Sequence, residues 1–393
     1  MRAALETLLQ TAVATGQVPG AVAMIADANG VIAEAAAGKR ALGAGAAMTP
    51  DTVFWLASMT KPIVSVAAMQ LVERGKLGLE TEVETLVAEL AAPRVLDGFD
   101  DAGRPRLRPA RRPITLRHLL THTSGFAYDF GNADILRYVR DNNIPRGTSG
   151  KRAALALPLV FDPGERWEYG ISTDWLGRVI EAASGQSLDR FIAENITGPL
   201  GMTGTGFGLD AGRAAHVAGL HARGPDGSLA PVPFAVPPAP EYQAGGHGMF
   251  GSPRDYLRFT RAILRRGELD GVRILKAETV DRMASNQIGD LPAGQVRSVI
   301  PEMALEIKPP PGIDFGWGLG FLINRQALPT GRGMGALSWS GVANTYFWID
   351  PGRDLTGVAM AQILPFGDPA AFNLAIGVEV TAYQRRPMSP APA

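Results

Sequence analysis

The 393-residue sequence contains no cysteine. Disulfide bonds, thiolate metal sites and a cysteine nucleophile are therefore excluded. Neither sign of charge is in excess, because 38 Lys and Arg residues balance 38 Asp and Glu residues. A neutral chain gives no electrostatic reason to expect nucleic acid or an anionic membrane surface as a partner.

Long apolar runs are absent as well, although 46% of the residues are hydrophobic and can build a substantial core. No run approaches the roughly 18 residues that a membrane-spanning helix needs, so no membrane association is expected. The first helical pattern, residues 2–13, is interrupted at Glu6, within the stretch where an export signal would carry its apolar core. We therefore expect a cytoplasmic protein.

Strand-like runs lie at both ends of the chain, and helical patterns fill most of the middle. Short turns join neighbouring runs, so the sheet that they form should be antiparallel and flanked by helices. The sequence predicts an α+β fold with one catalytic domain over 1–393, an α/β part of about 1–60 and 250–393, and an inserted helical part of about 61–249. The expected strands and the closing helix cover 21–26, 31–37, 315–323, 337–339, 346–350, 355–363 and 369–384.

An apolar strand-like run changes to a helical pattern at Ser58. A serine there can cap the unpaired N–H groups of a helix start, and Pro62 is tolerated in the first turn. Lys61, three residues after Ser58, lies on the same helical face and is close enough to share a proton with the serine. Spacing alone leaves capping and catalysis equally open.

Lysine at position 61 favours the catalytic interpretation. Only six of the 38 basic residues are lysines, and a lysine can lose its proton in a protein whereas an arginine cannot. The positive end of the helix dipole disfavours an ammonium group in the first turn and stabilises an anion that develops on Ser58. Because Ser-x-x-Lys is short and arises by chance, it needs partners elsewhere in the chain.

Two further patterns suggest chemistry, but the first departs from its motif at one position and the second at two. His118 and His122 could bind a metal from one helical face, yet Leu119 stands where a His-Glu-x-x-His metalloprotease carries its glutamate. Polar contacts inside the fold are the default for both histidines, and we expect neither a metal nor another cofactor. The stretch 147–152 resembles a phosphate loop, but Pro145 replaces the first glycine and Arg152 the required Ser or Thr.

Three stretches are expected to be irregular. The five arginines between 97 and 113 predict a solvated loop rather than a phosphate-binding surface, because no aromatic residues are interleaved with them. Phe234 to Tyr242 is rich in proline and predicts a surface loop. The glycine-dense stretch 245–251, which includes His247, is typical of close backbone approach to a ligand.

Three short motifs carry a resemblance to a known family: Ser58-Met59-Thr60-Lys61, Tyr169-Gly170-Ile171 and Trp339-Ser340-Gly341. In this order and separation they resemble the signature elements of the serine β-lactamase and penicillin-binding-protein superfamily. The resemblance runs nearly end to end. Within the superfamily the sequence is most similar to the family VIII carboxylesterases, which share the class C β-lactamase fold and carry Trp-x-Gly where lactamases carry Lys-Thr-Gly.

The resemblance implies a site for acyl chemistry. Ser58 would be the nucleophile, and Lys61 and Tyr169 would share the general-base role. The backbone N–H groups of Ser58 and Val342 would form the oxyanion hole. The residues expected to contact the substrate are Tyr128, Phe130, His247, Trp339 and Gly341.

Two departures from the lactamase pattern favour uncharged esters. Ile171 replaces the usual asparagine, and Trp339 replaces the lysine that helps to hold a substrate carboxylate. We also expect a narrow pocket, with Tyr128 and Phe130 as aromatic walls, that favours short acyl chains.

The sequence therefore predicts a serine esterase that hydrolyses small-molecule, short-chain acyl esters through an acyl-enzyme. β-Lactamase or DD-peptidase activity, amide hydrolysis and acyl transfer stay open as alternatives on the same scaffold. A non-catalytic binding homologue is disfavoured, because Ser58, Lys61 and Tyr169 are all present.

Overall fold

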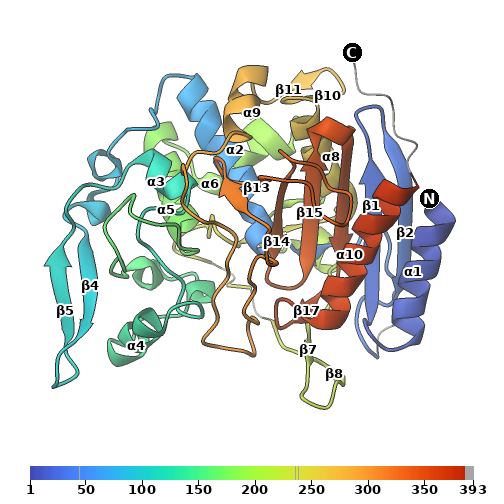
Figure 1. The fold of residues 1–393 in the computed structure, drawn as a ribbon, viewed down its shortest axis with the longest axis horizontal. Helices are drawn as coiled ribbons and strands as arrows, with labels where there is room; N and C mark the ends of the chain where they lie inside the picture. Colours follow the sequence, from blue (N-terminus) through green and yellow to red (C-terminus); the bar gives the residue numbers. More distant parts are fainter. Residues whose placement is uncertain (44, 235, 238, 386–393) are drawn as a thin grey trace.

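The computed structural model describes residues 1–43, 45–234, 236–237 and 239–385 (Figure 1). Ala235 and Pro238, in the proline-rich stretch, lie outside the described residues. A seven-stranded antiparallel sheet has the strand order β12-β13-β14-β15-β16-β1-β2. Its strands are β1 (Gly20–Ala26), β2 (Val31–Gly38), β12 (Phe315–Trp317), β13 (Leu322–Asn324), β14 (Leu337–Gly341), β15 (Thr345–Asp350) and β16 (Leu355–Met360).

The sheet is assembled from both ends of the chain, which confirms the predicted fold class. Strand β1 pairs with β2 on one side and with the C-terminal strand β16 on the other. Side chains alternate between the two faces, as the period of two requires. In β15, Phe347 and Ile349 enter the larger hydrophobic core, and Trp348 between them enters a second core.

Helices cover both faces of the sheet (Figure 1). The second core lies beneath α1 (Arg2–Ala14) and α10 (Pro369–Gln384), which bury Leu5, Leu9 and Val378 against it. The larger core lies beneath α8 (Pro253–Leu264) and extends into the helical middle of the chain. None of the helices in the described parts is long and apolar enough to cross a membrane.

Helix α2 (Thr60–Glu73) runs through the larger core, and its residues from Thr60 to Leu71 are all buried. A helix that is apolar on every side belongs in a core, and this placement takes the Lys61 side chain into the protein with it. A 3₁₀ turn, Ala57–Met59, precedes α2 and contains Ser58. Met59 is the N-cap residue of α2 and neither segment has a side-chain cap, so Ser58 does not cap a helix.

Local sequence features mark where two helices in the middle of the chain begin or end. Helix α5 ends at Gly185, whose φ of 72° is the left-handed conformation that glycine adopts readily. Thr115 and His118 form a capping box at the start of α3. The helices here and further along the chain are α3 (Leu116–Leu120), α4 (Ala133–Asp141), α5 (Ser172–Ser184), α6 (Leu188–Ile192), α7 (Ala211–Ala214) and α9 (Ala277–Met283).

Short strands outside the main sheet tie loops to the body of the protein. Strand β9 pairs with β3 on one side and with β6 on the other, and β17 pairs in parallel with β7. Their bounds, with those of the remaining strands, are β3 (Phe54–Trp55), β6 (Gly206–Phe207), β7 (His221–Arg223), β8 (Leu229–Pro231), β9 (Met249–Gly251), β10 (Glu268–Leu269), β11 (Val272–Arg273) and β17 (Ile363–Leu364).

The structure corrects three of the predicted segments. The arginine-rich stretch is a hairpin of β4 (Arg94–Phe99) and β5 (Pro105–Pro109), not a loop. Its Arg108 donates to both carboxylate oxygens of the buried Asp162, at 3.0 and 2.8 Å, which gives this segment a fixed partner in the body of the protein. The predicted strands 315–323 and 355–363 are each two strands: the chain reverses direction between β12 and β13, and β17 pairs with β7 outside the main sheet to which β16 belongs.

Candidate active site

A cavity of about 1040 Å³ opens beside Ser58. Segments from across the chain contribute to its wall, including the loop after α3, the proline-rich stretch and the end of β14. Most of the wall is apolar, which suits an organic substrate with little charge. Its aromatic lining consists of Trp55, Tyr128, Phe130, Tyr169, Phe234, Trp339 and Phe366.

Ser58, Lys61 and Tyr169 meet at the base of this cavity. Lys61 Nζ donates to Ser58 Oγ over 3.1 Å, and the hydroxyl oxygens of Tyr169 and Ser58 are hydrogen-bonded at 2.5 Å. Tyr169 approaches the serine from a segment 111 positions away, so the contact depends on the tertiary fold. Two groups that can pass a proton along hydrogen bonds, the Lys61 amine and the Tyr169 hydroxyl, therefore flank the serine oxygen.

The local backbone explains how Ser58 is presented. Ala57, directly before it, has a φ of 48°, a left-handed conformation that is costly for a residue with a Cβ atom. Gly341 at the end of β14 abuts this turn, since a Cβ atom there would lie 2.3 Å from the Leu56 carbonyl oxygen. That close approach places Val342 in the same cavity wall as Ser58.

Lys61 has two further acceptors besides Ser58. Its Nζ donates to the Tyr128 hydroxyl over 3.0 Å and to the Gly246 carbonyl over 2.8 Å. Three acceptors match the three N–H groups of an ammonium. The same arrangement holds a neutral amine, whose lone pair can face Ser58 while its two N–H groups bond Tyr128 and Gly246. The amine therefore keeps its position whether or not it carries the extra proton.

Two tyrosines flank Lys61, and their surroundings differ. Burial, followed by the negative charge of Asp174, raises the pKa of Tyr128 well above its ordinary value. Tyr128 is therefore a neutral phenol at physiological pH. The Tyr169 hydroxyl bonds the serine hydroxyl, whereas the Tyr128 hydroxyl bonds the Lys61 amine.

An aromatic cluster packs around Tyr169. The Trp339 indole nitrogen lies 3.4 Å from the Tyr169 hydroxyl, and the two ring centroids are 5.0 Å apart. The His122 ring, 5.2 Å from that of Tyr169, is 2% exposed. Burial first, and then the charge of Lys61, hold the pKa of His122 well below its ordinary value, so this histidine is neutral and serves as packing.

The expected substrate-contact residues divide into two groups. Tyr128, Phe130, His247 and Trp339 all line the cavity, and the rings of Tyr128 and Phe130 stack with centroids 5.0 Å apart. Gly341 is not part of the lining and packs on the backbone at Leu56. The expectation of a narrow pocket is wrong, because a volume of about 1040 Å³ far exceeds what a short acyl group fills.

Several residues at this site escaped the sequence analysis. Phe234 belongs to the stretch predicted as a surface loop, yet its ring lies 4.4 Å from that of Trp55 in the cavity wall. Trp55 in turn donates its indole N–H to the His247 carbonyl over 2.7 Å. In the glycine-dense stretch 245–251, expected to approach a ligand, Gly246 accepts a hydrogen bond from the Lys61 side chain, and the approach to a ligand stays a prediction. No sequence signal identified Asp174.

The two histidines considered for a metal have other partners. His118 Nδ1 accepts the Thr115 N–H over 3.1 Å in the capping box of α3. His122 lies among aromatic rings. Among the described residues there is no group of three or more His, Asp or Glu side chains placed to hold a metal ion.

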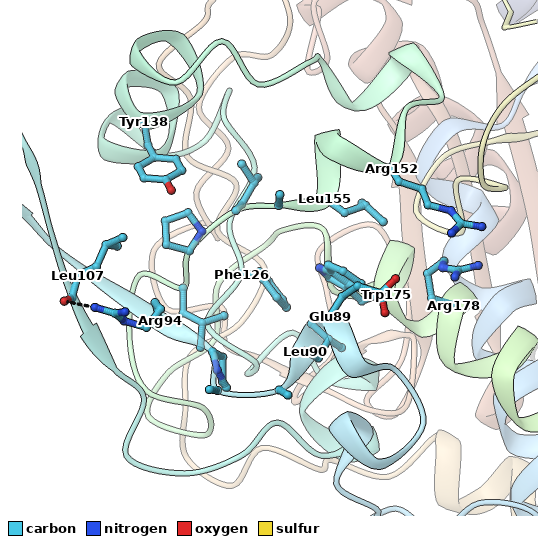
Figure 2. A pocket seen from close by; sticks show the side chains of 17 residues that line it. Glu89, Leu90, Arg94, Leu107, Phe126, Tyr138, Arg152, Leu155, Trp175 and Arg178 are labelled. Atoms are coloured by element: carbon cyan, nitrogen blue, oxygen red, sulfur yellow. Dashed lines mark hydrogen bonds between the residues drawn. The ribbon is translucent and has the colours of Figure 1, made fainter.

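A second, smaller hollow of about 320 Å³ has Phe126 and Trp175 in its lining (Figure 2). Arginines and aliphatic side chains make up much of its lining, among them Arg94, Leu155 and Arg178. No serine, lysine or histidine is part of that lining. The larger cavity is therefore the candidate active site.

The chain is similar to a family model over most of its length and to relatives named as an acyltransferase and an esterase. Residues 5–380 match the family model described as Beta-lactamase. The sequence is 34% identical to monacolin J acid methylbutanoyltransferase of Aspergillus terreus, with 96% of this chain and 95% of the relative covered. It is 32% identical to the lovastatin esterase of Penicillium rubens, with 92% and 93% covered.

A solved structure agrees with these relatives. A mutant of the simvastatin synthase of Aspergillus terreus superposes with a TM-score of 0.84 at 34% sequence identity, over 97% of this chain and 95% of that one. The fold is therefore the β-lactamase-like fold, a mixture of helices with an antiparallel sheet. Because the family match and both relatives extend over most of the chain, this protein belongs to the beta-lactamase family.

Proposed function

We propose that this protein is a serine esterase that removes a short acyl group from an apolar small-molecule ester. The observation that carries the proposal is the hydrogen-bonded set of Ser58, Lys61 and Tyr169 at the base of an apolar cavity. The family supports acyl chemistry in general, since its relatives by name include an acyltransferase and an esterase.

In the acylation step, Ser58 Oγ attacks the ester carbonyl carbon and its proton passes to the Tyr169–Lys61 pair. The carbonyl oxygen becomes an oxyanion, for which we propose the backbone N–H groups of Ser58 and Val342 as donors. As the tetrahedral intermediate collapses, Tyr169 returns the proton to the alcohol oxygen. The C–O bond to that alcohol breaks, and the acyl group stays on Ser58.

In the deacylation step, water takes the place of the departed alcohol. The Tyr169–Lys61 pair accepts a proton from this water as its oxygen attacks the acyl carbon, and Ser58 Oγ leaves with that proton. The carboxylic acid is released and the enzyme returns to its starting state. The same two side chains, Tyr169 and Lys61, thus act as the general base in both halves of the reaction.

The size and lining of the cavity favour an ester with a small acyl part and a large alcohol part. Its volume of about 1040 Å³ leaves most of the space for the alcohol part if the acyl part is short. Its aromatic lining suits a bulky apolar alcohol, and Trp339 contributes an indole ring rather than a positive charge. We therefore propose short acyl esters of large apolar alcohols as the substrate class.

The same volume favours a second candidate function, acyl transfer to an alcohol. A bulky apolar alcohol that occupies the cavity after acylation would be closer to the acyl carbon, and more concentrated there, than water. The relative named as a methylbutanoyltransferase is consistent with this alternative. Hydrolysis and transfer would then differ only in which hydroxyl group attacks the acyl-enzyme.

Lys61 and Tyr169 should behave as one catalytic unit. We expect Lys61→Ala and Tyr169→Phe each to lower kcat for a p-nitrophenyl ester by at least about a thousandfold, with the double variant scarcely worse, because each residue needs the other to move the proton. Steady-state kinetics on folded variants measures this. Losses that multiply in the double variant would show independent roles and contradict the shared proton path.

Esters should be preferred to β-lactams. A β-lactam carboxylate would find Trp339 instead of a cation, and a lost charge-assisted bond costs about 1.5–3 kcal/mol. We expect kcat/KM for p-nitrophenyl butyrate to exceed that for nitrocefin by at least about a hundredfold, and Trp339→Lys to narrow the gap. Equal values for the two substrates would argue against the esterase proposal.

Product analysis separates transfer from hydrolysis. With p-nitrophenyl butyrate as donor, a bulky apolar alcohol such as decahydronaphthol should capture the butyryl group at concentrations where ethanol does not, because only the larger alcohol fills the cavity. Chromatography gives the ratio of new ester to butyrate. Release of butyrate alone, whichever alcohol is added, would reject transfer and leave the esterase.

A further inference from the structure

Asp174 is a buried carboxylate that the mechanism above does not use. It lies in the first turn of α5 and is 1% exposed. Its Oδ1 accepts the Gly246 N–H over 2.9 Å, and its Oδ2 has no hydrogen-bond partner. None of the ion pairs formed within the described ranges includes it. A buried charge with an unsatisfied oxygen is costly, so its presence here needs a physical reason.

The position at the start of α5 is not a sufficient reason. An acidic residue in a first helical turn is favoured by the helix dipole, and that effect operates on the surface as well as in the interior. Asp174 does not bond an N–H group of its own helix. The hydrogen bond that its side chain accepts comes from Gly246, 72 positions further along the chain.

Gly246 lies between Asp174 and Lys61. Its N–H donates to Asp174, and its carbonyl accepts from Lys61 Nζ over 2.8 Å. A Cβ atom on residue 246 would lie 2.4 Å from Asp174 Oδ2 and 2.9 Å from the Tyr128 hydroxyl, so only glycine fits there. The carboxylate, the phenol and the amine therefore converge on one glycine from three different segments of the fold.

The charges of Asp174 and Lys61 act on the pKa of His247 in opposite directions. Burial is the main cause of the lowered pKa of His247, to which Lys61 adds while Asp174 counteracts it. Burial is likewise the main cause of the raised pKa of Tyr128, and Asp174 raises it further. Burial and then Asp174 also raise the pKa of Tyr242. The carboxylate thus raises the pKa of both Tyr128 and Tyr242.

We propose that Asp174 is the positioning residue for the Lys61 amine. One carboxylate oxygen accepts the Gly246 N–H and so holds the peptide whose carbonyl accepts from Lys61. The negative charge of the carboxylate also offsets the positive charge of Lys61 inside the protein. This inference rests on the proposed role of Lys61 in activating Ser58. It adds a fourth side chain, remote from the reacting atoms, to the group on which that activation depends.

The test uses the full-length protein and a fluorophosphonate, which reacts with an activated serine whatever the natural substrate is. Ser58 Oγ attacks phosphorus, fluoride leaves, and the hydroxyl proton passes to the Tyr169–Lys61 pair. The rate of adduct formation is measured by intact mass across a wide pH range for the wild type and for Asp174→Asn. The amide is the same size and keeps an acceptor for the Gly246 N–H.

Two changes are expected in Asp174→Asn. The plateau rate at high pH should fall by roughly ten- to a hundredfold, because the amine is less well placed. The pH range over which the labelling rate rises should also move to lower pH by about one unit or more. Removal of a nearby negative charge makes it easier for the Tyr169–Lys61 pair to lose its proton. A residue that only supports the fold would lower the plateau without moving this pH range.

Asp255→Asn is the matched control. Asp255 is also a buried carboxylate, 7% exposed, but its Oδ2 accepts from the Gly204 N–H at 2.8 Å and from the Thr205 hydroxyl at 3.0 Å. In this variant the labelling rate should rise over the same pH range as in the wild type. If Asp174→Asn does not fold, as judged by circular dichroism, Asp174→Ser carries the same comparison, because its hydroxyl can still accept from Gly246.

The positioning role would be overturned if Asp174→Asn kept the wild-type labelling rate at high pH and the wild-type pH dependence. It would also be overturned if the pH dependence of Asp255→Asn shifted by the same amount as that of Asp174→Asn. The outcome is separate from that of the proposed function. A wild-type protein that labels on Ser58 but turns over no ester would reject the esterase and transferase proposals, and the labelling profiles would still decide the role of Asp174.

Discussion

The position of the Lys61 amine is the constraint on which the rest of the site depends. A buried amine is tolerated only where its N–H groups have acceptors, and here the acceptors come from three separate segments. Ser58 lies in the turn before α2, Tyr128 in the loop after α3, and Gly246 in the glycine-dense stretch. The helical middle of the chain must therefore be docked on α2 before the amine is satisfied. Folding and assembly of the site are in this sense a single event.

The sheet contributes by fixing the opposite wall. Its strands come from both chain ends, and β14 ends where Gly341 meets the turn that carries Ser58. Trp339 on the same strand brings its ring to within 5.0 Å of the Tyr169 ring, which joins the sheet side of the cavity to the helical side. The apolar character of that residue links the fold to the proposed choice of substrate, because it leaves no cation at this position for a carboxylate.

Much of the fold could be predicted because its signals are local. The antiparallel sheet, the end of α5 at Gly185 and the change of pattern before α2 all depend on neighbouring residues. The motif order likewise brought Ser58, Lys61 and Tyr169 together as candidates. The division of the chain at about residues 60 and 250 stays a prediction.

Partnerships between distant positions could not be predicted in the same way. Lys61 and Gly246 are 185 positions apart, and no local pattern pairs them. The hairpin at 94–109 has the same explanation, since its Arg108 meets a carboxylate 54 positions away. Phe234 was assigned to a surface loop because proline content reports chain stiffness and says nothing about which side chain turns inward.

The most direct test of the account is a mass measurement of the acyl-enzyme. The protein is mixed with p-nitrophenyl butyrate, quenched in acid within the first turnovers and analysed intact and after proteolysis. The account predicts a mass increase of one butyryl group, located on Ser58 and absent from Ser58→Ala. A butyryl group on any other residue, or turnover by Ser58→Ala at the wild-type rate, would contradict it.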